Sequence, residues 1–209
     1  MRKLILATNN KNKVKEIREI LKELKIDIMS LSDLNIDVDI EETGSSFAEN
    51  SLIKARGIAD ILKKNNYKNF IVMADDSGLE VPYLGGEPGI FSARYSGVHG
   101  DDKGNNNNKL LLKLQGIPKS DRKANFRCAI GLIDSNNVEK VIEGTVEGFI
   151  TEREEGEGGF GYDPLFFYEP LNKTFGELSS EEKNSISHRA NALNKLKNEI
   201  EELLDKQEE

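Results

Sequence analysis

The stretch that decides the fold is Leu4-Ile5-Leu6-Ala7-Thr8-Asn9-Asn10-Lys11-Asn12-Lys13-Val14. Its apolar beginning, Leu4–Thr8, predicts a buried strand. Apolar residues then recur from Val14 at spacings of three, four and three, which is the period of a helix. The polar turn Thr8–Lys13 joins the two elements. A strand that runs directly into a helix indicates an α/β fold.

The remainder of the chain extends this pattern. Strands are expected at Ile26–Leu31, Ile71–Ala74, Phe126–Asp134 and Val138–Phe149, and helices after Ser46, around Leu110–Leu114 and along the C-terminal stretch that contains Leu193 and Leu196. Ser46 and Glu49 have the form of a capping box. Asn136–Asn137 marks a turn between the last two strands. We therefore predict a single domain, residues 1–209, of the α/β class with a mixed sheet.

The charge of the chain limits the function classes. The net charge is −8, which argues against general nucleic-acid binding because such binding neutralises backbone phosphates. Residues 1–25 are rich in Lys and Arg, whereas residues 26–53 hold seven acids and neither Lys nor Arg. This asymmetry suits either two solvated faces or a phosphate-attracting end beside a metal-attracting end.

Cysteine content and hydropathy predict the compartment. Cys128 is the one cysteine, so no intrachain disulfide forms and a reducing, cytoplasmic setting is expected. Its apolar neighbours predict a buried side chain rather than a nucleophile. The apolar run Leu4–Ala7 is too short for the core of a signal peptide. No segment is long enough to span a membrane, so we expect no membrane partner.

Two polar segments follow predicted strands, and in open α/β sheets ligands bind beyond the carboxyl ends of strands. The first is Thr8–Lys13. A helix N-terminus with Thr, Asn and Lys side chains offers backbone N–H groups and positive charge, which suits a phosphate cradle. It is not a P-loop, because G-x-x-x-x-G-K-[ST] is absent. The alternative is a polar turn with an Asn cap.

The second segment is Asp75-Asp76-Ser77-Gly78, and a further acidic pair stands in Glu41-Glu42-Thr43-Gly44. Carboxylates at the end of an apolar strand are costly unless they bind a metal or act as acid and base. Mg²⁺ takes one or two carboxylates in addition to substrate phosphates. Neighbouring strand residues point to opposite faces, so only one of the two aspartates need face the site. The alternatives are an Asp-Ser-Gly turn and an exposed acidic loop.

Gly156-Glu157-Gly158-Gly159-Phe160-Gly161 matches the dinucleotide-binding pattern G-x-G-x-x-G literally. Pro164 follows and forbids a regular helix there, so we reject NAD binding. The loop presents Phe160 and Tyr162, whose rings suit stacking on a nucleobase or packing in the core.

The last candidate segment is Ser187-His188-Arg189, with Lys183 upstream. Arg and Lys donors suit the carbonyl and ring-nitrogen acceptors of a purine. The alternative is Ser187 as an N-cap beside a basic surface. With only two histidines, a His-rich zinc site is excluded.

Together these segments resemble the inosine triphosphate pyrophosphatase family, also called the dITP/XTP pyrophosphatases. The matching stretches keep the family's order along the chain: Leu6–Lys13, Glu41–Gly44 with Phe47–Asn50, Asp75–Leu79, Pro88–Tyr95, Gly159–Pro164 and Ser187–Arg189. One departure is the presence of Asn10 and Asn12 where the bacterial pattern often has glycine.

The resemblance implies an elongated, two-lobed α/β fold around a long mixed sheet with flanking helices. It also implies a homodimeric enzyme that uses Mg²⁺ to hydrolyse ITP, dITP and XTP to the monophosphate and pyrophosphate, with the nucleotide in the cleft. Asp76 would be the proton acceptor and, with Glu41, a metal ligand. Lys54 is a lesser phosphate candidate, and a role for Asp75 stays open. The substrate contacts would be Thr8, Asn9, Asn10, Lys11, Asn12, Lys13, Ser77, Phe160, Gly161, Tyr162, Asp163, Lys183, His188 and Arg189.

Two other functions remain open at this point. One is a pyrophosphatase for other modified nucleotides, such as the pyrimidine nucleotides of Maf-like enzymes. The other is a nucleotide sensor without catalysis, which would need no water-activating base such as Asp76.

Overall fold

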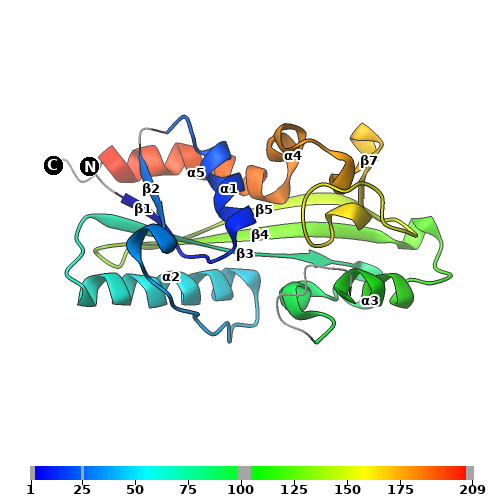
Figure 1. Ribbon diagram of the computed structural model, residues 1–209, viewed down its shortest axis with the longest axis horizontal. Helices are drawn as coiled ribbons and strands as arrows, with labels where there is room; N and C mark the ends of the chain where they lie inside the picture. Colours follow the sequence, from blue (N-terminus) through cyan, green and yellow to red (C-terminus); the bar gives the residue numbers. More distant parts are fainter. Residues whose placement is uncertain (1–2, 25, 98–104, 206–209) are drawn as a thin grey trace. The chain divides into compact units, whose positions relative to one another are not determined.

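The computed structural model describes residues 3–24, 26–97 and 105–205 of the 209-residue chain, with side chains described to residue 197. The described helices and strands form an α/β protein (Figure 1). In chain order they are β1 (Lys3–Leu6), α1 (Lys11–Ile20), β2 (Asp27–Ser30), α2 (Phe47–Lys64), β3 (Phe70–Glu80), α3 (Asn105–Lys113), β4 (Lys123–Asp134), β5 (Glu139–Ile150), β6 (Phe166–Tyr168), β7 (Lys173–Thr174), α4 (Ser180–Ile186) and α5 (His188–Asp205).

The strands form one sheet in the order β2-β1-β3-β4-β5-β6-β7. β1 pairs in parallel with β2 and β3, whereas β6 pairs antiparallel with β5 and β7. The predicted mixed sheet with flanking helices is therefore confirmed. The chain divides into two compact units. The first comprises Met1–Asp76, Cys128–Gly144 and Arg189–Glu209, and the second comprises Ser77–Arg127 and Thr145–His188.

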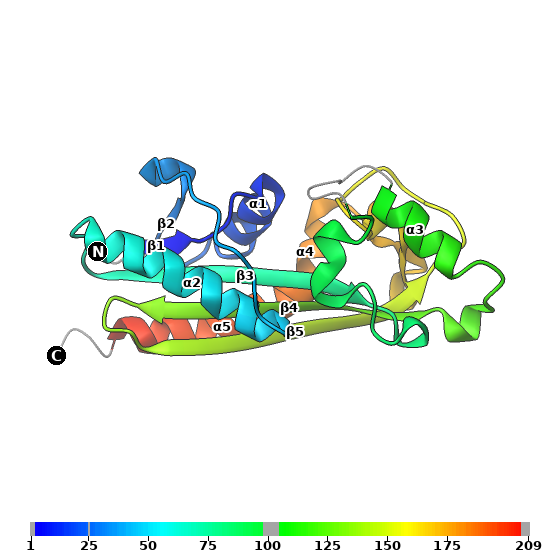
Figure 2. The ribbon, with the colours of Figure 1, turned by 90° about the horizontal axis from the view of Figure 1, so that it is seen from below.

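The first unit has three layers, which follow from alternation along its strands. In β1, Leu4 and Leu6 pack on the face that α1 and α5 cover, while Ile5 packs on the face that α2 covers. β3 alternates in the same way, with Ile71 and Met73 toward α1 and α5 and Val72 and Ala74 toward α2. Successive strand residues point to opposite faces. The helices accordingly lie on both sides of the sheet (Figures 1 and 2).

Helix α2 is fixed at its start and along its length. Ser46 caps it by accepting a hydrogen bond from the Glu49 backbone N–H at 3.1 Å, as its sequence predicts. The return bond of a capping box goes one residue further back, because the Glu49 carboxylate accepts from the Ser45 N–H at 2.8 Å. A Cβ on Gly131 of β4 would lie 2.7 Å from the Ser51 carbonyl carbon. Glycine at this position lets α2 approach the sheet closely.

The second unit has an aromatic core. Phe126 of β4 packs against Phe166 and Phe175 with ring centroids 4.6 and 5.9 Å away, and Leu110 and Leu114 at the end of α3 join the same cluster. Figure 2 shows α3 and α4, both of which belong to this unit. None of the helices in the described ranges is long and apolar enough to cross a membrane.

The strand boundary that differs most from the sequence prediction is the end of β3. The strand expected to end at Ala74 continues through Asp75–Gly78 to Glu80. Asp75 and Asp76 therefore lie inside a strand rather than in a turn at its end. Charged residues are tolerated there because side chains from other elements pair with them, as described next.

Candidate active site

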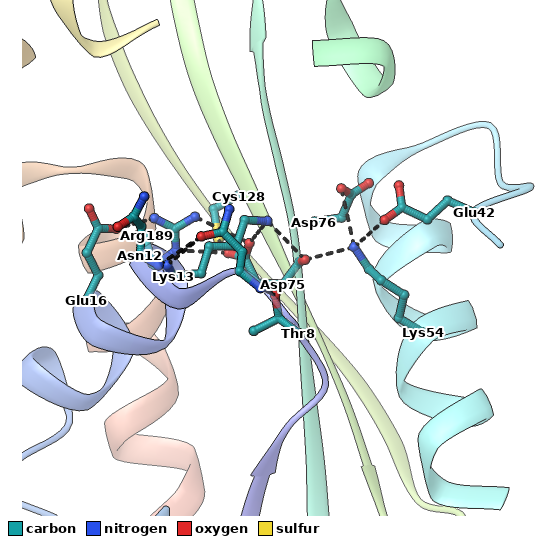
Figure 3. A network of polar contacts seen from close by, with 11 residues as sticks. Thr8, Asn12, Lys13, Glu16, Glu42, Lys54, Asp75, Asp76, Cys128 and Arg189 are labelled. Carbon is teal, nitrogen blue, oxygen red and sulfur yellow. Dashed lines mark hydrogen bonds and ion pairs between the residues drawn. The ribbon is translucent and has the colours of Figure 1, made fainter. Parts of the chain in front are cut away.

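Alternation along β3 sends its two aspartates to opposite faces of the sheet. Asp75 continues the series of Ile71 and Met73 and meets α1 and α5, whereas Asp76 continues the series of Val72 and Ala74 and meets α2. Figure 3 shows the two carboxylates directed away from each other. The prediction that they point to opposite faces is confirmed, and each has its own set of partners.

Asp75 is the centre of a buried ion cluster. Its Oδ2 accepts a hydrogen bond from Arg189 Nε at 3.1 Å and its Oδ1 accepts from Arg189 Nη2 at 3.3 Å. Lys13 forms an ion pair with the same carboxylate, and the Cys128 thiol donates to Oδ2 with a sulfur–oxygen distance of 3.0 Å. Burial opposes ionisation, but Arg189 and Lys13 hold the pKa of Asp75 well below its ordinary value.

Arg189 is buried within this cluster and binds acidic side chains there. Its side chain is 1% exposed, and it also forms an ion pair with Glu16 of α1. Burial disfavours its charge, yet Asp75 and Glu16 raise its pKa above the ordinary value. The guanidinium that the sequence analysis assigned to the purine therefore binds two carboxylates of the first unit.

Asp76 has a different environment, although it is also buried, with 6% of the residue exposed. Its Oδ1 lies 3.5 Å from the ammonium of Lys54, which binds Glu42 Oε1 at 2.8 Å. Burial raises the pKa of Asp76, although the charge of Lys54 opposes that effect. Within the described ranges, no group donates a hydrogen bond to the buried Oδ2 of Asp76. The Oδ2 atom of Asp76 is therefore available to a ligand, whereas both carboxylate oxygens of Asp75 already accept hydrogen bonds.

Two lysines from different helices converge on one backbone atom. The carbonyl oxygen of Asp75 accepts hydrogen bonds from Lys13 Nζ at 3.3 Å and from Lys54 Nζ at 2.9 Å. The Lys54 side chain is 14% exposed. Burial disfavours its charge, but Asp76 and Glu42 raise its pKa. Two ammonium groups therefore lie beside the aspartate pair of β3 (Figure 3). Such a pair of compact cations suits a polyanionic ligand.

The turn Thr8–Lys13 lies at the same end of the first unit, and part of its polarity serves the backbone. Asn10 caps α1, because its Oδ1 accepts from the backbone N–H groups of Asn12 and Lys13 at 2.9 and 3.2 Å. Thr8 Oγ1 accepts from the Asn10 N–H at 3.2 Å. The amide of Asn9 donates to the Val38 carbonyl at 3.1 Å. Two backbone donors expected for phosphate are thus satisfied by the Asn cap.

The side chains of Lys11 and Asn12 stay exposed at this turn, so they are accessible to a ligand. Together with the Lys13 ammonium and the positive end of α1, they are what the turn offers to a phosphate.

Acidic side chains near Asp76 fit a magnesium ion. The carboxylate that lies beside Lys54 belongs to Glu42, whereas Glu41 is exposed. Mg²⁺ is held by one or two carboxylates and completes its shell with substrate oxygens and water, so it needs no large protein cage. In the described part of the chain, no group of three or more His, Cys, Asp and Glu residues forms such a cage. Asp76, with its accepting Oδ2, is suited to be one of these carboxylates.

The second unit contains the other group of candidate residues, around Asp163. Its Oδ2 accepts from the Phe160 backbone N–H at 2.7 Å and from Lys183 Nζ at 2.6 Å. The Lys183 ammonium also lies 4.5 Å from the centroid of the Phe160 ring. Phe160, Asp163 and Lys183 are thereby brought together, although twenty residues separate the last two.

The remaining candidates of this unit have structural contacts. The Tyr162 hydroxyl donates to the Ser92 carbonyl at 2.9 Å and burial raises its pKa, so this ring packs in the core. Gly161 is held by Asn107 of α3, whose amide donates to its carbonyl at 3.1 Å. The His188 ring stacks on Phe126 with centroids 4.8 Å apart and an angle of 14° between planes. Ser77 lies in β3, half-buried, directly after Asp76.

The glycine loop gives a first testable prediction. Gly159 has φ of +73°, and a Cβ on it would lie 2.2 Å from Asp163 Oδ2. Gly159→Ala should force Asp163 away from Lys183 and lower the free energy of unfolding by more than the ~1–2 kcal/mol that left-handed backbone costs a residue with a side chain. Urea denaturation measures this change.

Gly161→Ala is the matched control for this change. Its φ is +59°, but a Cβ there meets no atom within 4 Å. It should cost only the backbone strain. Equal losses in the two variants would contradict a special role for the contact with Asp163.

Comparison with known proteins identifies the family of this chain. A family model described as the Ham1 family matches residues 4–199. The chain belongs to the Ham1 family. The match covers both units, including the lysine- and aspartate-bearing elements of the first and the Asp163 loop of the second.

Individual Ham1 relatives match over nearly their whole length. A protein of Clostridium perfringens named dITP/XTP pyrophosphatase is 52% identical over 98% of this chain and 100% of its own. One of the same name from Bacillus subtilis is 47% identical over 96% and 98%. The solved structure of the Staphylococcus aureus Ham1 protein superposes with a TM-score of 0.82 at 43% identity, covering 95% of this chain and 98% of that one. The resemblance stated from the sequence is confirmed.

Each unit also contains contact residues that the sequence analysis did not assign to a site. Glu16 and Cys128 join the cluster around Asp75, and Asn107 holds the glycine loop. Glu42 was noted only as one of an acidic pair. A helical spacing of three residues between Lys13 and Glu16 places both on one face of α1, which is the signal that would have linked Glu16 to the site.

Proposed function

We propose that this chain hydrolyses deaminated purine nucleoside triphosphates, namely ITP, dITP and XTP, to the monophosphate and pyrophosphate. The observation that carries the proposal is the difference between the environments of Asp75 and Asp76 on β3. Asp75 is neutralised by Arg189 and Lys13, while Asp76 keeps a buried oxygen without a donor among the described residues. The names of the Clostridium and Bacillus relatives, dITP/XTP pyrophosphatase, support the substrate class.

The first unit is assigned the triphosphate. Lys13 and Lys54 converge on the Asp75 carbonyl and would offset the charge of the phosphoryl groups, together with the turn Thr8–Lys13 at the start of α1. Phosphoryl transfer depends chiefly on positioning and on charge neutralisation. The chain carries a net charge of −8, so its overall field repels a triphosphate and local cations are needed.

Asp76 would act as the general base that accepts a proton from the attacking water. A water molecule attacks the α-phosphorus, the bond from that phosphorus to the bridging oxygen breaks, and pyrophosphate leaves. Asp76 accepts the proton that the water loses, and its raised pKa brings it nearer to a useful base strength. Asp76 and Glu42 would hold Mg²⁺, and Glu41 remains a second candidate from the same loop. When bound, the ion supplies positive charge at the phosphates.

The second unit would recognise the purine base of the nucleotide. The half-buried Phe160 ring would stack on the purine, as aromatic side chains do on bases. Inosine and xanthosine carry an oxygen at position 6 where adenosine carries an amino group. Donors from Lys183 or His188 would pair with that oxygen and would face the amino group of adenine unpaired, which discriminates strongly. Asp163 positions the Lys183 ammonium for this task.

An analysis of the products of ITP hydrolysis tests the proposed function. Purified protein with ITP and Mg²⁺ should release pyrophosphate and IMP in equal amounts. ATP should be hydrolysed far more slowly than ITP under the same conditions. Release of orthophosphate and IDP would refute the assignment of the broken bond, and binding of nucleotides without turnover would refute catalysis.

The family resemblance also suggests a homodimer in the cytoplasm, and both are part of this proposal. The single, buried Cys128 is compatible with a reducing compartment. Sedimentation equilibrium of the purified chain at several concentrations decides between one and two copies.

A further inference from the structure

Asn50 of α2 is a buried polar residue that none of the roles above explains. It is 0% exposed and occupies a position in the buried stripe of α2. Ser51, its neighbour in the chain, packs directly on Gly131 of β4, so the backbone at this point has little freedom. An amide fully removed from water costs free energy unless both its ends find partners.

One end of the amide holds the acidic loop. Asn50 Oδ1 accepts a hydrogen bond from the Gly44 backbone N–H at 2.8 Å. The fit is close, because a Cβ on Gly44 would lie 2.6 Å from that oxygen. Glu42 stands two residues before Gly44. The Asn50 carbonyl thus fixes the loop that presents Glu42 to Lys54.

The other end of the amide lies beside Asp76. Asn50 stands one helical turn before Lys54, so both side chains lie on one face of α2, and Lys54 reaches Asp76 Oδ1 at 3.5 Å. Over the part of the chain that the structure describes, Asn50 Nδ2 is a buried donor without an acceptor, and Asp76 Oδ2 is a buried acceptor without a donor. Burial raises the pKa of Asp76, and the Asn50 amide acts against that effect.

We propose that Asn50 is a positioning residue of the active site. Its Oδ1 fixes the acidic loop at Gly44, and its Nδ2 donates to one lone pair of the Asp76 carboxylate, which leaves the other lone pairs of that carboxylate for Mg²⁺ or the proton. One side chain then sets the place of both carboxylates, Glu42 and Asp76. This inference rests on the proposed function for its effect on turnover. Its effect on the carboxylates themselves is independent of any substrate.

Two substitutions separate the two ends of the amide. Asn50→Ala removes both the acceptor for Gly44 and the donor for Asp76. Asn50→Asp keeps an acceptor for the Gly44 N–H at nearly the same place, but it cannot donate and it repels the Asp76 carboxylate. Ser51→Ala is the matched control, since it removes a buried hydroxyl that bonds to the Ala48 carbonyl on the same helix.

Steady-state kinetics with ITP test the role of Asn50 Nδ2 as a hydrogen-bond donor to Asp76. Both Asn50 variants should lose kcat by about 10- to 100-fold, the usual cost of removing a residue that orients a metal-binding carboxylate. KM should change little, because the lost interaction is not one with the substrate. Ser51→Ala should keep the kcat of the wild type. Wild-type kcat in Asn50→Asp would overturn the donor role, and this variant decides if Asn50→Ala does not fold.

Binding of Mn²⁺ alone, measured by electron paramagnetic resonance without nucleotide, tests the placement of the two carboxylates. Asn50→Ala should bind Mn²⁺ about 10- to 100-fold more weakly than the wild type and Ser51→Ala. Equal affinities would overturn the inference. Wild-type protein that leaves ITP intact would refute the proposed function instead, and the Mn²⁺ measurement would still decide the role of Asn50.

Discussion

Asp76→Asn should abolish turnover of ITP while the nucleotide still binds. An asparagine fills the same space and keeps an oxygen near Lys54, but it cannot accept a proton at neutral pH. Loss of a general base typically costs about 10²- to 10⁴-fold in kcat, and loss of a metal-binding carboxylate adds to this. Pyrophosphate release measures the rate, and calorimetric titration with ITP measures the affinity.

The control for this substitution is Asp60→Asn, which changes an exposed aspartate on α2. It makes the same change in net charge and should leave kcat unaltered. If Asp76→Asn turned over ITP at the wild-type rate, Asp76 would have no part in the mechanism. A loss of ITP affinity with unchanged kcat would assign Asp76 to substrate binding alone.

Local sequence patterns predicted the framework of this site well. The strand and helix around Thr8–Lys13 are confirmed as β1 and α1, because apolar periodicity is a local signal. Alternation in β3 was enough to foresee that Asp75 and Asp76 point to opposite faces. The family resemblance named Asp76 as the functional residue of the pair, but the local pattern alone does not show which of the two stays available to a ligand. That depends on partners 62 and 114 residues away in the chain, Lys13 and Arg189.

The end of β3 was placed too early for the same reason. The strand was predicted from its apolar run, Ile71–Ala74, and an Asp-Ser-Gly turn was one alternative for the residues that follow. The strand continues to Glu80, because three cations from other elements neutralise the pair. Long-range ion pairs leave no periodic trace in the sequence, and their effect appears only when the elements are packed.

The type of a residue alone does not determine its partner, as Arg189 illustrates. A guanidinium near a histidine suits a purine, and the segment was interpreted in that way. In the structure it binds Asp75 and Glu16, a role that an arginine fulfils equally well. Similarly, Tyr162 has the ring of a base-stacking residue but uses its hydroxyl inside the core. Residue chemistry narrows the set of partners, and packing selects among them.

Asp75→Asn should destabilise the protein strongly, since Arg189 would then be buried with only part of its compensating charge. Removing one partner of a buried ion pair typically costs about 3–5 kcal/mol of folding free energy. Urea denaturation at neutral pH measures the loss. The matched control is Glu139→Gln, which breaks another two-pronged pair, from Arg56 to Glu139 at 2.6 Å, on an exposed surface. Exposed pairs are worth less than about 1 kcal/mol.

The pH dependence of stability gives the same substitution a second readout. The pKa of Asp75 in the folded protein is well below its ordinary value of 3.8, so near and below pH 3.8 the unfolded chain binds a proton that the folded protein does not. The stabilisation is therefore complete at pH values above the ordinary value and is lost as the pH falls from there toward the folded pKa. In Asp75→Asn this part of the acid sensitivity should disappear. A wild-type pH profile in the variant, or a loss no larger than that of Glu139→Gln, would show that Arg189 and Lys13 find their compensation elsewhere.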